Sequence, residues 1–187
     1  MTKNQNNQEW KSWIKALVIA VIITFLVRTF LFIPIAVEGP SMQPNLEDRD
    51  YVVINKLNYR ISEPKRFDVV VFHASVDKDY IKRVIGLPGE TVEYVDDVLY
   101  INGSPIEETH LVEELARLEE GERYTRDFSL EDIPGGHEVI PENHVLLLGD
   151  NRPNSTDSRN LGLIPYDELV GSASVIYWPI NRIGIVK

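Results

Sequence analysis

Ser41 is the first residue of this chain whose position suggests covalent chemistry, because it lies in the stretch EGPSMQP, close to two prolines and a glycine. A serine in such a stretch is commonly a turn residue. The chain has no cysteine, so a nucleophile has to be a serine, a threonine or an activated carboxylate. A serine nucleophile also needs a base that takes its proton.

Histidine is the usual base, but the four histidines of this chain support that role weakly. His73 and His144 lie in strand-like runs, where a structural or solvent-facing role is common, and His110 and His137 flank or lie within an acidic segment. No G-x-S-x-G motif is present. The pattern therefore gives little support to a Ser-His-Asp triad.

Lys82 is the best candidate for a base of another kind, since a Ser-Lys pair is a known variant of the triad. It lies in the apolar stretch YIKRVIGLPGE, and on a strand Tyr80, Lys82 and Val84 share one face. A lysine acts as a base only when it is neutral, and burial among apolar groups lowers its pKa from about 10.4. The alternative is a lysine on an edge strand, where it discourages aggregation.

A third polar patch, GDNRPNSTDSR, follows the apolar run VLLL directly. Such a loop is either a hydrogen-bonded network near a site or a plain turn. The elements around these three patches are short runs rich in apolar and β-branched residues and bounded by turn residues, which predicts a mostly β domain. The runs are 51–55, 68–74, 80–86, 91–95, 98–103, 144–150, 171–178 and 182–186.

Two further local structures are predicted within the β domain. The run 91–103 predicts a hairpin with Asp96 and Asp97 at its turn. The acidic segment 104–138 contains leucines at helical spacing, at positions 111, 115 and 118, and is interpreted as a partly helical peripheral insertion.

The N-terminal region predicts a membrane anchor. Residues 16–37 form an apolar run of 22 residues, interrupted mainly by Arg28, and about 20 such residues cross a bilayer. We expect residues 1–12 in the cytoplasm, an anchor at 13–36 that is transmembrane and interfacial, and an extracytoplasmic domain at 37–187, because the preceding lysines set the orientation. The alternative is a cleavable signal sequence. Trp10, Trp13, Phe30, Phe32, Ile33 and Ile35 are expected near the membrane surfaces.

The charge of the chain is uneven, and this limits its partners. The formal net charge is −10, with +2 in residues 1–15 and −13 in residues 38–187. Phosphate binding needs a basic face, so nucleic acid is not an expected partner.

Taken together and in this order, EGPSMQPNL, RFDVVVF, YIKRVIGLPGE and GDNRPNSTDSR resemble the bacterial type I signal peptidases, in the single-span form of Gram-positive organisms. The resemblance implies a β-sheet catalytic domain with a LexA-like core and a membrane-bound Ser-Lys endopeptidase. It implies cleavage of signal peptides from exported preproteins after small residues at −1 and −3, at the lipid bilayer. No metal or other cofactor is implied.

The resemblance also implies a role for particular residues. Ser41 matches the nucleophile and Lys82 the general base, while the oxyanion donors are the Ser41 N–H and a second group at the position of Gly39. Ser155 matches a residue that orients the lysine. Asp157 and Arg159 match a supporting charged pair. Val37, Met42 and Ile81 match the pocket for the small substrate residue.

The sequence departs from the family pattern at three places and leaves two alternatives. Gly39 stands where some members have a serine that donates to the oxyanion, Pro153 replaces a usual aspartate, and Phe67 a common glycine. One alternative is a membrane-tethered β-rich binding module without catalysis. The other is a LexA-like self-cleaving protease, although this chain has no basic DNA-binding helices.

Overall fold

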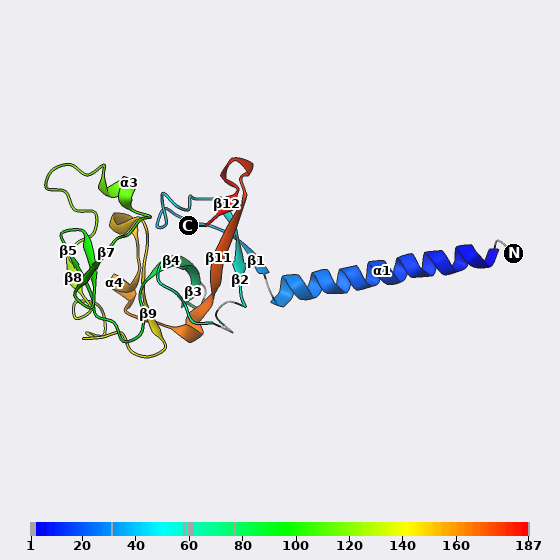
Figure 1. Cartoon of the computed structure of the whole chain (residues 1–187), viewed down its shortest axis with the longest axis horizontal. Coiled ribbons are helices and arrows are strands. Elements are labelled where there is room, and N and C mark those ends of the chain that lie inside the picture. The colour runs from blue at the N-terminus through cyan, green and yellow to red at the C-terminus, as the bar shows by residue number, and fades with distance from the viewer. Residues whose placement is uncertain (1–2, 31, 58, 60–61, 77, 187) are drawn as a thin grey trace.

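A computed structural model of the chain describes residues 3–30, 32–57, 59, 62–76 and 78–186, with the backbone alone for 3–9, 26–30 and 32. The side chains of Phe30 and Phe32, which were expected near a membrane surface, and that of Arg28, which interrupts the apolar run, lie outside the described residues. The chain consists of one long N-terminal helix followed by a mostly β domain (Figure 1). The mostly β prediction is therefore confirmed.

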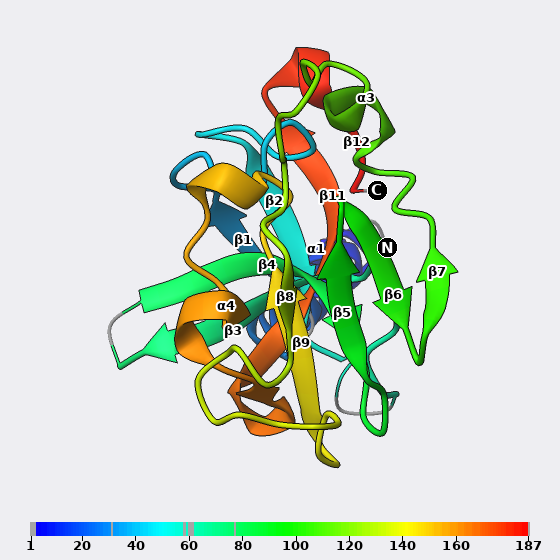
Figure 2. The same cartoon turned by 90° about the vertical axis from the view of Figure 1, so that its left-hand side faces the viewer.

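Two antiparallel sheets form the β domain, and Figure 2 shows the smaller one beside the larger. The larger sheet has the order β1-β2-β11-β3-β4-β9-β10, and β12 pairs with β11. Its strands are β1 (Phe32–Ala36), β2 (Tyr51–Asn55), β3 (Val69–Ser75), β4 (Lys78–Gly86), β9 (His144–Leu148), β10 (Ile164–Pro165), β11 (Leu169–Trp178) and β12 (Gly184–Ile185). The smaller sheet, in the order β7-β6-β5-β8, has β5 (Val92–Val95), β6 (Val98–Ile101), β7 (Ser104–Ile106) and β8 (Phe128–Ser129).

The predicted hairpin is confirmed, since β5 and β6 pair in register from Val92–Ile101 to Val95–Val98. Its two turn residues have positive φ angles, 53° for Asp96 and 64° for Asp97. Positive φ at both central residues is the geometry that a two-residue hairpin turn needs, and aspartate tolerates it.

The predicted anchor at 13–36 contains two elements, the C-terminal part of the helix α1 (Lys3–Phe30) and the strand β1. The helix ends at Phe30, and residues 32–36 form a strand that pairs with β2. In the part of the chain that the structure describes, no helix reaches the combined length and apolar character needed to cross a membrane. The anchor therefore stays a prediction.

The insertion at 104–138 differs from the expectation of a peripheral, partly helical segment. Its helix α3 is a single turn, Val112–Leu115, and the rest contributes β7 and β8 to the smaller sheet. Most of the segment is exposed, but Glu108, Leu111 and Thr125 are buried, so individual side chains of the insertion reach the domain interior. The spacing of the leucines at 111, 115 and 118 predicted a longer helix than the single turn observed. Leu111 precedes that turn and is buried, so it does not extend an amphipathic helix.

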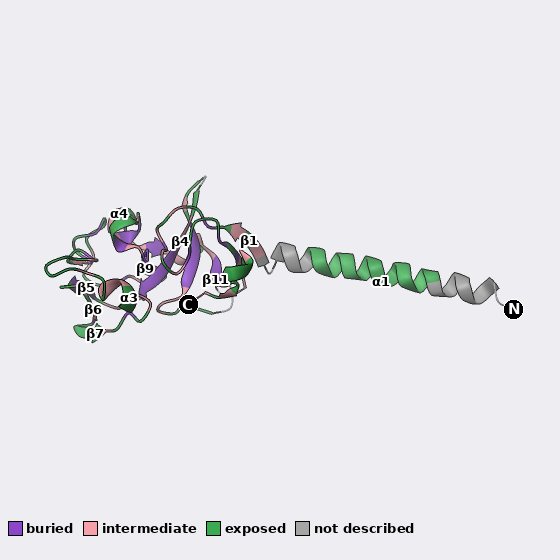
Figure 3. Ribbon diagram, turned by 90° about the horizontal axis from the view of Figure 1, so that it is seen from above, coloured by how far each residue is buried: buried purple, intermediate pink, exposed green. Residues whose placement is uncertain are grey.

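Buried residues follow the strands through the centre of the domain, as the purple segments of Figure 3 show. One apolar cluster joins the two sheets and includes Ile85, Tyr94 and Leu148. Another lies beneath the stretch that holds Ser41 and includes Val37, Met42, Val52 and Val71. This second cluster gives the Ser41 region a packed support.

Short helices complete the domain and carry the polar loop. They are the 3-10 turns η1 (Arg152–Asn154), η2 (Tyr166–Glu168) and η3 (Ile180–Arg182) and the helix α4 (Ser158–Leu161). The Asp157 side chain caps α4 by accepting from the Arg159 N–H, which fixes the end of the loop.

Candidate active site

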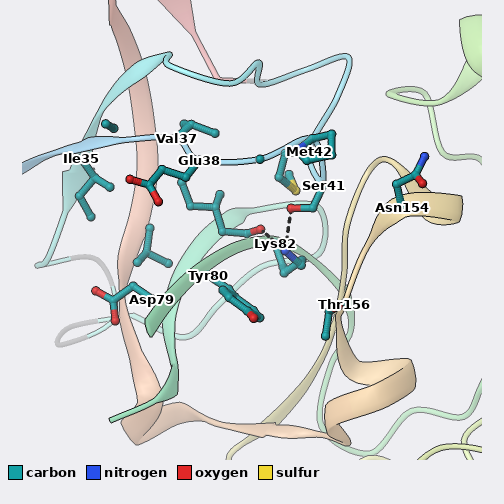
Figure 4. Close-up of a pocket in the computed structure, with 15 residues that line it drawn as sticks. Ile35, Val37, Glu38, Ser41, Met42, Asp79, Tyr80, Lys82, Asn154 and Thr156 are labelled. Carbon is teal, nitrogen blue, oxygen red and sulfur yellow. Dashed lines mark hydrogen bonds between the residues drawn. The ribbon is translucent and has the colours of Figure 1, made fainter. Parts of the chain in front are cut away.

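Ser41 and Lys82 meet in one cleft of about 290 Å³, from separate parts of the chain. Lys82 Nζ lies 2.8 Å from Ser41 Oγ, within hydrogen-bond distance, and Nζ also donates to the Ile81 carbonyl at 2.9 Å (Figure 4). Nζ lies 5.0 Å from the centre of the Tyr80 ring as well. The arrangement can transfer a proton between a serine hydroxyl and a lysine amine.

Lys82 is buried, so it is not a solvent-facing lysine that discourages aggregation at a strand edge, although its position lies just beyond the pairing of β4 with β9. Its side chain belongs to β4, which pairs with β3 on one side and β9 on the other, and only 3% of the residue is exposed. Burial lowers the pKa of Lys82 to about 8, although Asp157 and Asp150 act in the opposite direction. At a pH near 8 a substantial fraction of the amine is therefore neutral.

The Ser41 turn is held against the polar loop by backbone hydrogen bonds. The Asn151 N–H donates to the Ser41 carbonyl at 3.0 Å, and the Asn151 side chain donates to the Pro40 carbonyl at 3.2 Å. Gly149 has to be a glycine here, because a Cβ at this position would lie 2.5 Å from the Ser41 carbonyl oxygen and 2.2 Å from Ser155 Oγ. The loop thus fixes the position of the serine.

The backbone N–H groups of the two candidate oxyanion donors, Ser41 and Gly39, differ in whether they already donate a hydrogen bond. The Ser41 N–H donates to no other described residue, and Ser41 lines the cleft. The Gly39 N–H instead donates to the Asp48 carboxylate at 2.9 Å. Gly39 has a φ of +85°, which favours glycine, and its N–H is already engaged in this structure.

Of the three predicted supporting residues, Asp157 and Arg159 bind each other, whereas Ser155 does not contact Lys82 through a hydrogen bond. Ser155 Oγ is buried and has no hydrogen-bond partner of good geometry among the described residues, so it does not bond Lys82 here. Asp157 and Arg159 form an ion pair at 2.8 Å, and Asp157 also accepts from the Gly149 N–H at 3.0 Å. Burial raises the pKa of the Asp157 carboxyl, but hydrogen bonds from Arg159, its positive charge and the Gly149 N–H outweigh burial, so the pKa lies below its usual range.

The three expected pocket residues, Val37, Met42 and Ile81, all line the cleft. Val37 and Met42 are almost fully buried, at 4% and 1% exposure. Ile35 and Val71 add further apolar surface to the same cleft. This lining suits a small apolar side chain.

Several residues that support the site were missed by the sequence analysis. Arg83 binds Asp150 through two hydrogen bonds, of 2.7 and 2.6 Å, and Asn45 from the Ser41 turn donates to Asp150 at 2.8 Å. Arg152 pairs with Glu108 of the insertion, and the Tyr124 hydroxyl donates to the Asp150 carbonyl at 2.9 Å. The polar loop was recognised as a possible network, but nothing in the sequence indicated that Glu108 and Tyr124 would reach it.

The chain as a whole is similar to known proteins. A family profile described as "Signal peptidase, peptidase S26" matches residues 10–178. The chain belongs to the signal peptidase family. A relative named signal peptidase I from Bacillus caldolyticus is 41% identical over 182 residues, which covers 97% of each chain. Signal peptidase IB from Staphylococcus aureus is 40% identical over 178 residues and matches 94% of this chain and 93% of its own length.

A crystal structure of a signal peptidase I from Enterococcus faecalis is also similar, with 42% identity and a TM-score of 0.56. The match covers 60% of this chain and 97% of that one. The resemblance of the sequence to type I signal peptidases is therefore confirmed, and the chain is a peptidase of this family. Membership in a peptidase family argues against the binding module as an alternative.

Proposed function

We propose that the chain is a membrane-anchored serine endopeptidase that removes signal peptides from exported preproteins, with Ser41 as nucleophile and Lys82 as general base. The observation that carries this proposal is the distance of 2.8 Å between Lys82 Nζ and Ser41 Oγ inside an apolar-walled cleft. The names of the relatives supply the substrate class.

The proposed reaction begins with neutral Lys82. Its amine takes the proton of the Ser41 hydroxyl while Ser41 Oγ attacks the carbonyl carbon of the scissile peptide bond. The ammonium then gives that proton to the leaving amine nitrogen, the C–N bond breaks, and an ester to Ser41 is left. Water attacks the ester as Lys82 takes one of its protons, and that proton returns to Ser41 Oγ when the acid is released.

The developing oxyanion needs hydrogen-bond donors, and the Ser41 N–H is proposed as the first. One such donor contributes about 2.7–4 kcal/mol to transition-state stabilisation in a comparable enzyme. Gly39 is a poorer candidate for the second donor than the sequence suggested, because its N–H donates to Asp48. A second donor from Gly39 requires that the Asp48 bond break when substrate binds.

A substrate strand is proposed to bind between two open strand edges. β4 pairs with β9 only between Arg83 and Gly86, which leaves residues 78–82 without a partner strand on that side among the described residues. β1 lies at the end of the larger sheet and pairs with β2 alone. A strand added here presents alternate side chains to the apolar pocket, which explains selection at both −1 and −3.

The roles of the supporting residues and of the membrane follow from the same proposal. Asp157 and Arg159 hold the loop that carries Asn151 against the serine, and Ser155 is proposed to orient the lysine once substrate is bound. Residues 10–25 of α1 are exposed along the whole described length, and an apolar helix without a protein partner is suited to lipid. We therefore place the β domain outside the cytoplasm, anchored through α1.

The proposal is tested with the full chain in detergent and a precursor that carries alanine at −1 and −3. Mass spectrometry of the products should show cleavage directly after the −1 alanine by the native chain and none by Ser41→Ala. Ser75→Ala, an exposed serine at the end of β3, is the matched control and should cleave normally. Cleavage by Ser41→Ala, or cleavage at unrelated bonds, would contradict the proposal.

A further inference from the structure

The cleft carries two carboxylates that the proposed reaction does not use. Glu38 and Asp79 both line it, and Figure 4 shows both on the Ile35 side of the Ser41–Lys82 pair. Glu38 is exposed and makes no hydrogen bond or ion pair with another described residue. The Asp79 side chain is 45% exposed, and its carboxylate lies 2.6 Å from a ring nitrogen of His73.

The charge of the cleft depends on the state of Lys82, because it is the one basic residue among the described residues that line it. In the proposed reaction Lys82 has to be neutral, so the ready form of the cleft has two carboxylates and no lysine charge. The carboxylates that act on the pKa of Lys82 are Asp157 and Asp150, behind the pair. Glu38 and Asp79 therefore face the space that a ligand enters.

Strand geometry places the two carboxylates beside the same part of a bound substrate. Asp79 precedes Lys82 by three residues on β4, which is about 10 Å along that strand, and Glu38 precedes Ser41 by three residues in the segment between β1 and the Ser41 turn. On an extended substrate the same distance leads from the −1 residue to the −4 residue. Glu38 follows the buried Val37 and so faces the open side, where the −2 and −4 side chains lie when −1 and −3 fill the pocket.

We propose that Glu38 and Asp79 determine substrate specificity by favouring precursors with lysine or arginine at −4 and disfavouring those with aspartate or glutamate there. The inference rests on the proposed function and names a subset of its substrates. Because both carboxylates are partly solvated, the preference for lysine over glutamate is about tenfold in kcat/KM at low salt. It declines as salt screens the charges.

The test uses three peptides that differ only by lysine, glutamine or glutamate at −4, all with alanine at −1 and −3. The native chain should give a ratio of kcat/KM for lysine over glutamate of about 10, and raising the salt from about 0.05 to about 0.5 M should reduce it. The double variant Glu38→Gln, Asp79→Asn should lower the ratio to below about 2. The ratio is taken within each variant, so a general loss of activity cancels.

Two control variants test whether the preference depends on a carboxylate at position 38 and whether it depends only on the net charge of the protein. Glu38→Asp keeps the carboxylate and should retain most of the preference. Glu138→Gln removes an exposed charge outside the cleft and should leave the ratio of the native chain unchanged. A ratio near 1 in the native chain, or an unchanged ratio in the double variant, overturns the inference alone. Failure of the native chain to cleave any of the three peptides overturns the proposed function and this inference with it.

Discussion

Lys82 combines two properties that usually exclude each other, since it is a lysine and yet almost fully buried. The cost of burying an ammonium lowers its pKa to about 8, and the remaining polar contacts, Ser41 Oγ and the Ile81 carbonyl, suit a neutral amine as well as a charged one. Asp157 and Asp150 limit the decrease. The fold thus keeps a fraction of this amine neutral at a pH where an exposed lysine would be protonated, as the proposed reaction requires.

Activity should follow the titration of Lys82. For an uncharged peptide, kcat/KM should rise about tenfold per pH unit below a pH of about 8 and level off above it, because the neutral amine is the active form. Lys82→Arg should be inactive at every pH, since a guanidinium stays protonated. A profile that shows no ionisation near this pH, or an active Lys82→Arg, would contradict the assignment of the base.

Burial of Lys82, which lowers its pKa, should also reduce the stability of the folded chain at neutral pH. Because the folded pKa of about 8 lies below the value of 10.5 for a free lysine, the unfolded chain binds more protons between these pH values, so the free energy of unfolding rises with pH there. Lys82→Met removes the buried ammonium and should raise the free energy of unfolding at pH 7 by about 1–3 kcal/mol. This gain should shrink as the pH rises from 8 to 10.5 in chemical denaturation, and a destabilised Lys82→Met at pH 7 would count against a charged buried lysine.

At the scale of elements, the site depends on a buried polar layer that joins the polar loop to β4, to the Ser41 turn and to the insertion. Arg83 and Asp150 bind each other at 1% and 0% side-chain exposure, and Arg152 and Glu108 form a second pair at 0% and 4%. Arg152 also donates to the Tyr94 hydroxyl and to Thr125, both at 3.0 Å. The insertion thereby stabilises the loop that positions Ser41.

Removing the insertion's partner of Arg152 should destabilise the domain. Glu108→Ala leaves the Arg152 guanidinium buried without its counter-charge, which costs about 3–5 kcal/mol. Glu113→Ala, at 87% side-chain exposure, is the matched control and should change stability by less than about 0.5 kcal/mol. Thermal unfolding of both variants measures the difference, and equal stability of the two would mean that the insertion is peripheral after all.

The strands were accessible from sequence because local patterns carry them, whereas the pairing of Ser41 with Lys82 came from the resemblance of four motifs, taken together, to a known family. Alternating β-branched residues mark β2 to β6, and a lysine among isoleucine and valine predicts burial. The strand β1 was not accessible, since an apolar edge strand and a membrane-surface segment have the same composition. The bond from the Gly39 N–H to Asp48 and the pairing of Arg152 with Glu108 were also missed, because tertiary contacts across 9 and 44 residues leave no local pattern.

At the scale of the whole molecule, Figure 1 shows α1 extending away from the sheets, while the cleft opens next to β1, the strand that follows the helix. Ser41 lies eleven residues after the end of α1 at Phe30. This arrangement keeps the cleft near whatever surface the helix occupies. If α1 lies in a bilayer, the cleft lies close to the lipid surface, where the end of a signal peptide emerges.

The anchor makes a prediction about fractionation. Expressed in bacteria, the full chain should remain in the membrane pellet after alkaline carbonate and be released by detergent. Val21→Arg places a charge within the apolar run, costs about 2.5–3.5 kcal/mol of insertion energy and should shift part of the chain to the soluble fraction. Val112→Arg, at an exposed position in the β domain, should not. Full release of the native chain by carbonate would rule out the anchor.

The most direct test of the Ser41–Lys82 pair compares the native chain with Lys82→Ala on one reporter precursor in detergent. Lys78→Ala, an exposed lysine at the start of the same strand, serves as the control. Lys82→Ala should lower kcat by at least about 10³-fold with a folded β domain, and Lys78→Ala should cleave at the native rate. Cleavage by a folded Lys82→Ala at a rate close to that of the native chain would contradict the account.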